Sequence, residues 1–301
     1  MAAPREGWEC VMTISAERLA GYAARLRETF PALAVEEIHL LGAGDNNDAV
    51  LVNGRMVFRF PRHAQAVKAL ATETALLRAL AGRLPLAVPR PVYVADDVDG
   101  YERIPGEELA RETVRALPAA DQQAVAEQLA AFLAALHAIS ANELPPEARS
   151  IRDSYEEWAD LAERIEQRLF PPMRPDAREV VADQLAALLA MVRAGGWTPA
   201  MRHGDFGPSN VLYDPQTCRL TGVIDFGSAG LGDPALDIAG VICRAGYGEA
   251  FLARMAPVYP DAMHMVERAR RYAATFPLQY VLYGVEQGDT EALRQGLCDY
   301  V

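Results

Sequence analysis

The pattern of hydrophobic and polar residues changes character once along the chain. A helical pattern that includes Leu19 and Leu26 comes first, and residues 38–60 then read as strands with a turn at Asn53-Gly54. Leucines recur at helical spacing over residues 70–80. The first third of the chain therefore predicts a small sheet with one main helix against it.

Beyond Pro105-Gly106 the pattern becomes mostly helical. Apolar stripes run through residues 125–136 and 181–192, and the second stripe ends at Gly195-Gly196. We therefore predict an α+β protein with two lobes, a small antiparallel sheet lobe and a larger helical lobe. The predicted segments are an N-terminal extension (1–12), a first lobe (13–100), a hinge (101–106) and a helical C-terminal lobe (107–301).

Composition agrees with a soluble enzyme of about two domains. The chain has 301 residues, 51% of them hydrophobic, which is enough for a large core. No apolar run approaches the roughly 20 residues of a membrane helix, and the first residues lack the apolar core of a secretion signal. We expect a cytoplasmic monomer with no membrane contact. The cysteines are scattered without metal-ligand spacing, as expected for reduced thiols: Cys10, Cys218, Cys243 and Cys298.

The net charge of −12 argues against a nucleic-acid partner. Acidic residues outnumber basic ones by 41 to 29, whereas polyanion binding needs clustered Lys and Arg. The excess of acid is compatible with a cationic substrate, and equally with a solvated surface that keeps the protein soluble. Charge alone therefore selects no substrate.

Two short motifs in the middle of the chain carry the chemistry. Residues 203–210, His-Gly-Asp-Phe-Gly-Pro-Ser-Asn, have the spacing of the protein-kinase catalytic loop, and residues 224–227, Ile-Asp-Phe-Gly, repeat the kinase metal motif. Phosphoryl transfer depends on positioning the hydroxyl and on metal ions held by hard oxygen ligands. We predict Asp205 as the catalytic base, and Asn210 and Asp225 as Mg²⁺ ligands.

The segment between the motifs explains how they meet. Residues 212–224 read as a strand, a turn with proline and a returning strand, so Asn210 and Asp225 lie at the two ends of a hairpin. Each residue taken alone would be an ordinary turn residue. The two motifs in kinase order favour the catalytic interpretation, with His203 orienting the loop by hydrogen bonding.

A glycine-rich turn at residues 41–50 is a candidate cover for nucleotide phosphates. Glycine lets backbone N–H groups approach phosphates closely, although a plain hairpin turn has the same composition. The turn is neither a Walker loop nor a complete dinucleotide fingerprint. The candidate residues are Gly42, Gly44, Asp45 and Asn46.

Arg59 is the candidate cation for those phosphates, with Glu73 on the following helix as its partner. Arg59 lies among apolar residues of a predicted strand, so an inward side chain needs a counter-charge. The alternatives are an outward Arg59 with a surface Glu73, or Lys68 as the cation.

The chain resembles the aminoglycoside phosphotransferase family of small-molecule kinases, most closely its 2″-phosphotransferase branch, from about Ile14 onward. The segments that carry the resemblance are 41–46, 58–62 (Phe-Arg-Phe-Pro-Arg), 84–89, 100–106, the two central motifs and 283–288.

This resemblance implies a bilobal protein-kinase-like fold with ATP or GTP as the phosphoryl donor and Mg²⁺ as cofactor. It implies that the nucleotide base lies against Tyr101, Glu102, Arg103 and Ile104. It also implies that the helical lobe brings an acceptor hydroxyl, with an aminoglycoside as the leading candidate, to Asp205.

The sequence departs from the family pattern at two places. The family commonly has Lys where this chain has Arg59, and a planar guanidinium is not equivalent to an ammonium. In the aminoglycoside-modifying members, the helix after the second motif tends to carry several acids, whereas residues 241–248 have none and only Glu249 follows. Asp205, Asp237 and Glu249 are the candidate acceptor contacts, although Asp233 and Asp237 follow Asp225 closely and are expected first to support the metal loop and cap a helix.

Three other functions stay open on the sequence alone. The chain is a kinase of another alcohol, such as a sugar, an amino alcohol or another antibiotic, if the acid-poor stretch reflects its substrate. It is a nucleotide-binding module without catalysis if Arg59 disables transfer. It is a helical scaffold if both motifs are coincidental, and nucleotide would then leave its melting temperature unchanged.

Overall fold

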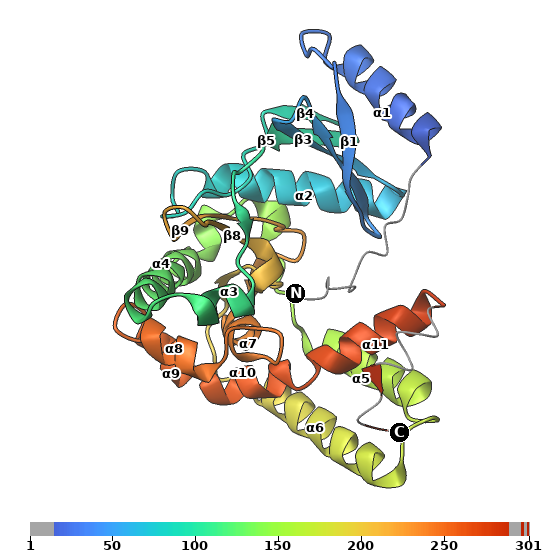
Figure 1. The fold of residues 1–301 in the computed structure, drawn as a ribbon. Coiled ribbons are helices and arrows are strands. Elements are labelled where there is room, and N and C mark those ends of the chain that lie inside the picture. Colours follow the sequence, from blue (N-terminus) through green and yellow to red (C-terminus); the bar gives the residue numbers. More distant parts are fainter. Residues whose placement is uncertain (1–14, 289–295, 298–299, 301) are drawn as a thin grey trace, which may run out of the picture. The chain divides into compact units, whose positions relative to one another are not determined.

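A computed structural model describes residues 15–288, 296–297 and 300, and its chain divides into two compact units (Figure 1). The first unit comprises the chain up to Arg78 together with Pro89–Arg103, and the second comprises Ala79–Val88 and the chain from Ile104 onward. The predicted hinge contains the division at Arg103, whereas residues 79–88, predicted in the first lobe, belong to the second unit. The predicted extension 1–12, Cys10 and Cys298 lie outside the described residues.

The first unit is an antiparallel five-stranded sheet with helices. Its hairpin turn at Asn53-Gly54 has φ values of 51° and 66°, the left-handed conformation that primed two-residue turns require. The predicted turn is therefore confirmed. In sheet order the strands are β1 (Ile38–Ala43), β2 (Asn47–Val52), β3 (Met56–Pro61), β5 (Val98–Glu102) and β4 (Tyr93–Ala95), and the helices are α1 (Ala16–Thr29) and α2 (Ala64–Leu80).

Alternation along β3 decides which side chain faces which helix. Phe58 and Phe60 pack in the core that also contains Leu26 of α1. Successive strand residues point to opposite faces, so Arg59 points to the other side, where it contacts Glu73 of α2. The alternation along β3 thus directs the charged side chain of Arg59 into the interior of this unit.

Residues 88–92 form no strand, and the strand that follows them directly is β4. The preceding residues Pro89-Arg90-Pro91 contain two prolines. Proline has no N–H to donate to a strand ladder, so the paired region begins only after them.

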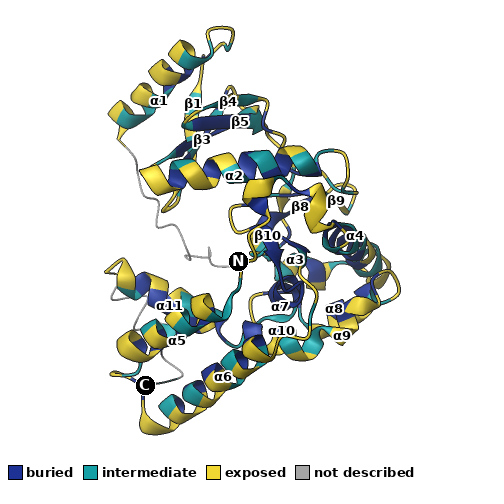
Figure 2. Cartoon of the chain, turned by 180° about the vertical axis from the view of Figure 1, so that it is seen from behind, coloured by how far each residue is buried: buried dark blue, intermediate teal, exposed yellow. Residues whose placement is uncertain are grey.

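The second unit is mostly helical, as predicted. The apolar stripe at residues 125–136 lies in α4, which carries buried residues along its length (Figure 2). The stripe at residues 181–192 lies in α6, and Gly195, at φ 62°, ends that helix. The helices are α3 (Arg111–Ala116), α4 (Ala119–His137), α5 (Tyr155–Leu169), α6 (Pro175–Ala194), α7 (Ala235–Ile242), α8 (Glu249–Met255), α9 (Asp261–His264), α10 (Val266–Ala273) and α11 (Phe276–Glu286).

Two small antiparallel sheets in this unit carry the central motifs. One has the order β6-β8-β9 and the other pairs β7 with β10. The predicted hairpin is β8-β9, which confirms that interpretation. The strands are β6 (Glu107–Glu108), β7 (Ala200–Arg202), β8 (Val211–Asp214), β9 (Arg219–Val223) and β10 (Gly230–Gly232), and short 3-10 turns cover Ala141–Glu143, Pro146–Ala148 and Pro208–Asn210.

Buried helix contacts support these sheets. Phe132 of α4 stacks on Phe206 of the predicted catalytic loop, with ring centroids 6.1 Å apart. A separate cluster joins α5, α6 and α11 through residues such as Ile165, Val181 and Val281. Among the described residues, no helix has the length and apolar character that crossing a membrane demands.

Candidate active site

The predicted catalytic loop follows β7 and is fixed by a buried histidine. His203 is fully buried, and its Nε2 lies 2.9 Å from the carbonyl oxygen of Ile224. Its Nδ1 accepts a hydrogen bond from the backbone N–H of Asp205 at 3.3 Å, so Nε2 carries the proton. One imidazole therefore connects the residue before Asp225 with Asp205, the arrangement expected of an orienting residue.

Asn210 brings the two motifs together at one end of the β8-β9 hairpin. Its side-chain Nδ2 donates to the backbone oxygen of Asp205 at 2.8 Å and to Asp205 Oδ2 at 3.2 Å. Its own backbone oxygen accepts from Ile224 N at 2.9 Å. Asp205, Asn210 and Asp225 thus lie around one short stretch of backbone, as the hairpin predicts.

Asp225 has an unusual backbone conformation. Its φ of 63° is in the left-handed region, which is uncommon for residues other than glycine. Such conformations persist where the surrounding structure holds them, and they cluster at functional sites. The exposed carboxylate accepts a long hydrogen bond from Gly227 N at 3.4 Å.

The donor set at this end of the hairpin fits Mg²⁺. Asn210 donates through its amide nitrogen, so its amide oxygen is the atom that can bind a metal, and the side chains of Asp205 and Asp225 are both exposed. Carboxylate and amide oxygens are ligands that Mg²⁺ accepts, together with water and phosphate oxygens. Within the described part of the chain, no group of three or more His, Cys, Asp or Glu forms a separate metal cluster.

Asp237 of α7 supports the catalytic loop and does not face an acceptor, which corrects the substrate role expected for it. It is fully buried, and its Oδ2 and Oδ1 accept from the backbone N–H groups of His203 and Gly204, both at 2.8 Å. His137 Nε2 also donates to Oδ2, at 2.9 Å, while His137 Nδ1 accepts from the hydroxyl of Tyr259 at 2.8 Å. Both carboxylate oxygens are therefore used inside the protein.

Charge and hydrogen bonding keep Asp237 ionised. Burial by itself raises the pKa of this carboxyl, but the hydrogen bond from His137, the electrostatic influence of the His137 and His203 rings and the N–H of Gly204 together lower the pKa below its ordinary value of 3.8. A carboxyl with a lowered folded-state pKa stabilises the fold above the unfolded-state pKa, and this stabilisation is lost as the pH falls through the folded-state pKa.

Replacing Asp237 with Asn should destabilise the protein in a pH-dependent way. The amide keeps one acceptor but faces two buried N–H donors, so we expect a loss of about 1–3 kcal/mol in the free energy of unfolding at pH 7. The difference between wild type and variant should shrink as the pH falls below about 4. Denaturant unfolding at several pH values measures it, and a difference that stays constant down to the acid limit would contradict the assignment.

Arg202, at the end of β7, links both motifs to the segment that precedes α5. Its Nε and Nη2 donate to the carboxylate of Asp153 at 2.6 and 2.8 Å, and its Nη1 donates to the backbone oxygen of Ser228 at 2.9 Å. Gly204 lies directly against this guanidinium with φ 86°, and a Cβ there would fall 1.8 Å from Arg202 Nη1. Only glycine fits between the catalytic loop and this ion pair.

Arg59 is the centre of a buried charge cluster in the first unit. Its Nη1 donates to Glu73 at 2.6 Å, as the sequence pairs them, and its Nε and Nη2 bind the carboxylate of Asp99 at 3.0 and 2.7 Å. Thr74 Oγ1 also donates to Asp99, and the Tyr101 ring lies 5.6 Å from the guanidinium carbon. The outward alternative for Arg59 is therefore wrong.

The competing cation Lys68 and the nucleotide candidates Glu102 and Arg103 occupy exposed positions, whereas Ile104 is half-buried. Lys68 is exposed on α2, so Arg59 is the buried cation. Glu102 pairs with Arg55 at 3.0 Å, and Arg103 N donates to Arg55 O at 2.8 Å. Ile104 belongs to the second unit, where its side chain lies beside Gly222.

The glycine-rich turn joins β1 to β2. Gly44 N donates to Asn47 O at 2.9 Å, and Arg62 donates from its side chain to Gly44 O and from its backbone to Asn46 O, both at 2.8 Å. Neither Gly42 nor Gly44 has a positive φ, and a Cβ at Gly42 would meet no atom within 4 Å. The fold therefore tolerates a side chain at Gly42. Asp45 lies in the same turn.

Glu249, the other expected acceptor contact, is engaged elsewhere. Its two carboxylate oxygens bind Arg270 at 2.8 and 2.9 Å, and both side chains are exposed. Arg270 lowers the pKa of this carboxyl. An acceptor amine would have to displace this ion pair.

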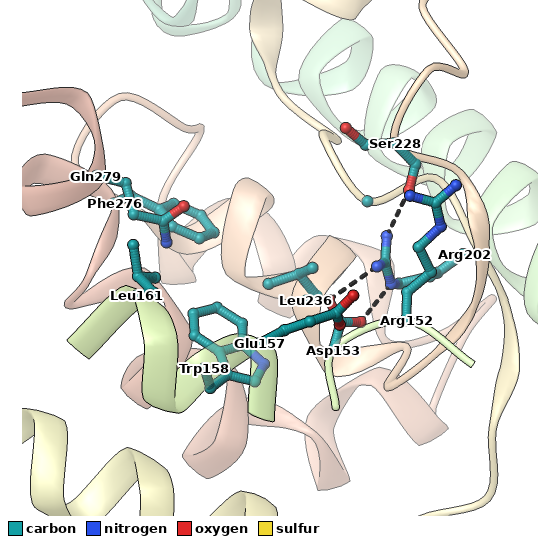
Figure 3. A pocket seen from close by; sticks show the side chains of 11 residues that line it. Arg152, Asp153, Glu157, Trp158, Leu161, Arg202, Ser228, Leu236, Phe276 and Gln279 are labelled. Atoms are coloured by element: carbon teal, nitrogen blue, oxygen red, sulfur yellow. Dashed lines mark hydrogen bonds and ion pairs between the residues drawn. The ribbon is translucent and has the colours of Figure 1, made fainter. Parts of the chain in front are cut away.

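A cavity of about 280 Å³ opens next to both motifs (Figure 3). Gly204, which precedes Asp205, and Ser228, which follows the Asp-Phe-Gly motif, are among its lining residues. Its other lining residues come from the segment before α5, from α5 itself, from β7, α7 and α11. They are Arg152, Asp153, Glu157, Trp158, Leu161, Arg202, Leu236, Phe276 and Gln279.

The amino-acid sequence matches a known protein family over most of its length. A model of the phosphotransferase enzyme family matches residues 37–274, which include the glycine-rich turn, Arg59 and both central motifs. The chain belongs to this family. The resemblance to aminoglycoside phosphotransferases and the kinase-like α+β fold are thereby confirmed.

Individual members of the family are similar to this phosphotransferase over half of its length or more. Viomycin phosphotransferase of Streptomyces vinaceus is 34% identical over 262 residues, which cover 83% of the chain and 88% of that protein. An aminoglycoside 3′-phosphotransferase of Streptomyces fradiae is 34% identical over 51% of the chain and 57% of its own length. The structure of an aminoglycoside 2″-phosphotransferase of type IIIa with GDP and kanamycin superimposes with a TM-score of 0.83 at 26% identity, covering 92% of the chain and 96% of its own.

Sequence reasoning missed three residues that support the site of this phosphotransferase. Asp99 completes the Arg59 cluster, Asp153 holds Arg202, and His137 holds Asp237. Each contact joins residues 40 to 100 positions apart. Of the three, only Asp99 had a signal in the sequence, which was the arginine at position 59. The planar guanidinium has enough donors to bind a second carboxylate besides Glu73.

Proposed function

We propose that this phosphotransferase moves the terminal phosphoryl group of a nucleoside triphosphate to a hydroxyl group of a small molecule. The observation that carries the proposal is the convergence of Asp205, Asn210 and Asp225 at one end of the β8-β9 hairpin. Three oxygen-bearing side chains at this spacing are the parts that phosphoryl transfer needs. They argue against a module that binds nucleotide without catalysis.

Asp205 acts as the base in this proposal. Its side chain is exposed, while Asn210 donates to its Oδ2 and His203 holds its backbone N–H. The acceptor oxygen forms a bond to the terminal phosphorus, the bond from that phosphorus to the nucleoside diphosphate oxygen breaks, and the hydroxyl proton passes to Asp205. The network around Asp237 keeps the loop in position for this transfer.

Asn210 and Asp225 would hold Mg²⁺ through the amide oxygen and the carboxylate. The ion, when bound, neutralises the charge of the phosphate oxygens. The left-handed backbone of Asp225 fixes the direction of its carboxylate before nucleotide arrives, which reduces the ordering that binding requires.

Arg59 is the proposed contact for the nucleotide phosphates. Its hydrogen bonds to Glu73 and Asp99 use three of the five N–H groups of a guanidinium, so two remain for phosphate oxygens. The two carboxylates fix its direction. We propose ATP or GTP as donor, with the base near Tyr101, because a relative of the same fold is known with GDP. We also propose that the enzyme works as a monomer in the cytoplasm, where nucleoside triphosphates are available.

Replacing Gly42 with Ala tests whether the glycine-rich turn contacts nucleotide, because the fold should accept the substitution. The added methyl meets no atom within 4 Å and the backbone is not left-handed, so the melting temperature should change by no more than about 2 °C. If nucleotide phosphates approach the turn, KM for nucleotide should rise several-fold with little change in KM for the acceptor. An unchanged KM for both would remove this turn from the nucleotide site.

Two antibiotics are candidate acceptors because of the proteins that this chain resembles. An aminoglycoside modified at its 2″ position is supported by the structural likeness to the kanamycin-bound 2″-phosphotransferase. A second candidate, viomycin, is supported by the 34% identity to viomycin phosphotransferase over most of both chains.

A mass-spectrometric screen tests the function directly. Wild-type protein, Mg²⁺ and either ATP or GTP are incubated with kanamycin, gentamicin, viomycin and simple alcohols, with Asp205→Asn as the blank. We expect a phosphorylated acceptor only with the wild type. Products that form equally with both proteins would exclude the proposed mechanism.

A further inference from the structure

The cavity beside Gly204 and Ser228 has a charge pattern of its own. Arg202 and Asp153 form a bidentate pair at 2.6 and 2.8 Å, so they neutralise each other. Arg152 and Glu157 remain, one cation and one anion, and both are exposed. Figure 3 shows Arg152 on the side of Ser228 and Glu157 next to Trp158.

These two charges are available to a ligand. Glu157 accepts one hydrogen bond, from Ser154 N to its Oε2 at 2.9 Å, as part of the capping box of α5. Its other oxygen makes no hydrogen bond within the described part of the chain. The structure records no side-chain hydrogen bond or ion pair of Arg152 with any described residue, so its guanidinium can take an acceptor group of a ligand.

The rest of the lining is largely apolar and aromatic. Leu161 and Phe276 lie together on one side of the cavity, opposite the two arginines (Figure 3). Trp158 is only 7% exposed, and its indole N–H has no hydrogen-bond acceptor among the described residues. A buried N–H without a partner costs free energy, which a ligand oxygen or a water would recover.

We propose that this cavity is the acceptor site and that it selects a small zwitterionic hydroxyl compound with an apolar ring, in place of a polycation. The proposal rests on the phosphotransferase function above. Glu157 binds the single cationic group, Arg152 binds a carboxylate or carbonyl group, and the ring packs on Trp158 and Phe276. The hydroxyl group then extends past Gly204 toward Asp205.

Charge balance is the reason for excluding a polycation. Every ammonium group that leaves water needs a carboxylate partner, and Glu157 is the one carboxylate of the lining that is not already paired with an arginine. Arg152 repels a second ammonium. The volume of about 280 Å³ is at the lower limit of ligand pockets and suits one ring with short substituents.

A matched series of dipeptides isolates the two charges. Seryl-phenylalanine has a hydroxyl group, a ring, an ammonium and a carboxylate, its C-terminal amide lacks the carboxylate, and its N-acetyl form lacks the ammonium. Calorimetry with the wild type should show about tenfold tighter binding of the free dipeptide than of either blocked form. Kanamycin should bind more weakly than the free dipeptide.

Two variants should each remove one preference. Arg152→Gln should bind the free dipeptide and its C-terminal amide equally well, and should still bind the free dipeptide more tightly than the N-acetyl form. Glu157→Gln, which preserves the capping box, should do the reverse. Arg115→Gln and Glu156→Gln make the same charge changes at exposed positions outside the cavity and should leave both preferences intact.

Several outcomes overturn the proposal. Equal binding of the three dipeptides to the wild type, no binding of any of them, or tightest binding of kanamycin would each do so, and none of these depends on a variant that folds. Because binding is measured without nucleotide, the result is separate from the transfer reaction. Binding preferences as expected without any phosphoryl transfer would sustain the site and reject the proposed function.

Discussion

Replacing Asp205 with Asn is expected to lower kcat for phosphoryl transfer by about 10²–10⁴-fold, the usual contribution of a positioned general base. The amide keeps the size of the side chain but cannot accept the proton of the acceptor hydroxyl. Asp205 is exposed, and its contacts with Asn210 and His203 involve mainly its backbone. The variant should therefore fold normally and bind nucleotide with a Kd close to that of the wild type.

Steady-state kinetics of acceptor phosphorylation measures kcat, and titration with nucleotide by calorimetry measures the Kd. Asp160→Asn makes the same change at an exposed position of α5 and serves as the control. The surface ion pair of Asp160 with Arg164 contributes little to the free energy of unfolding. A variant at Asp205 that retains the wild-type kcat would show that this residue is not the base. Loss of nucleotide binding with loss of activity would instead show a structural role.

Replacing Arg59 with Met is expected to destabilise the first unit by about 3–5 kcal/mol, the usual cost of removing one partner from a buried charge cluster. The side chains of Glu73 and Asp99 are 5% and 1% exposed, and methionine would remove the guanidinium that contacts both buried carboxylates. Burial by itself lowers the pKa of Arg59, but Glu73 and Asp99 raise it well above its ordinary value, so the guanidinium stays charged. Nucleotide affinity should fall as well.

Arg55→Met is the matched control for Arg59→Met, since it removes the same residue type from the same hairpin. Arg55 and Glu102 have side chains that are 74% and 65% exposed, so their pair should contribute no more than about 1 kcal/mol. Denaturant unfolding, followed for each transition, compares the two variants. Equal destabilisation by both would contradict the buried cluster.

The same cluster accounts for the departure of this chain from the lysine that its family commonly has. A lysine ammonium is a point charge on a flexible stem, whereas the guanidinium of Arg59 binds Asp99 through two parallel hydrogen bonds and still reaches Glu73. Asp99 therefore makes arginine the better residue at this position. Arg59→Lys should retain the charge and lose the bidentate contact.

Local sequence was sufficient for the parts of the site that lie close together in the chain. Asp205 and Asn210 are five residues apart, and the hairpin that brings Asp225 to them has strong turn and strand signals. The same holds for the Asn53-Gly54 turn and the leucine spacing of α2. These features depend on backbone geometry over a few residues.

The contacts that fix the site depend on tertiary packing, and no local pattern encodes them. Asp237 has a carboxylate on an apolar helix, and only the packing of α7 against the catalytic loop shows that it accepts from His203 and Gly204. Strands β7 and β10 have three residues each, too few for a period-two pattern. The cavity likewise combines segments from across the second unit.

We propose above all that this phosphotransferase transfers a phosphoryl group by means of Asp205, Asn210 and Asp225. The most direct test is one incubation with γ-labelled ATP or GTP, Mg²⁺ and the acceptor that the screen identifies, followed by isolation of both products. The account predicts label on an acceptor hydroxyl, one nucleoside diphosphate per labelled acceptor, and loss of the label in Asp205→Asn. Nucleoside diphosphate released without labelled acceptor, or label that forms equally in the variant, would contradict it.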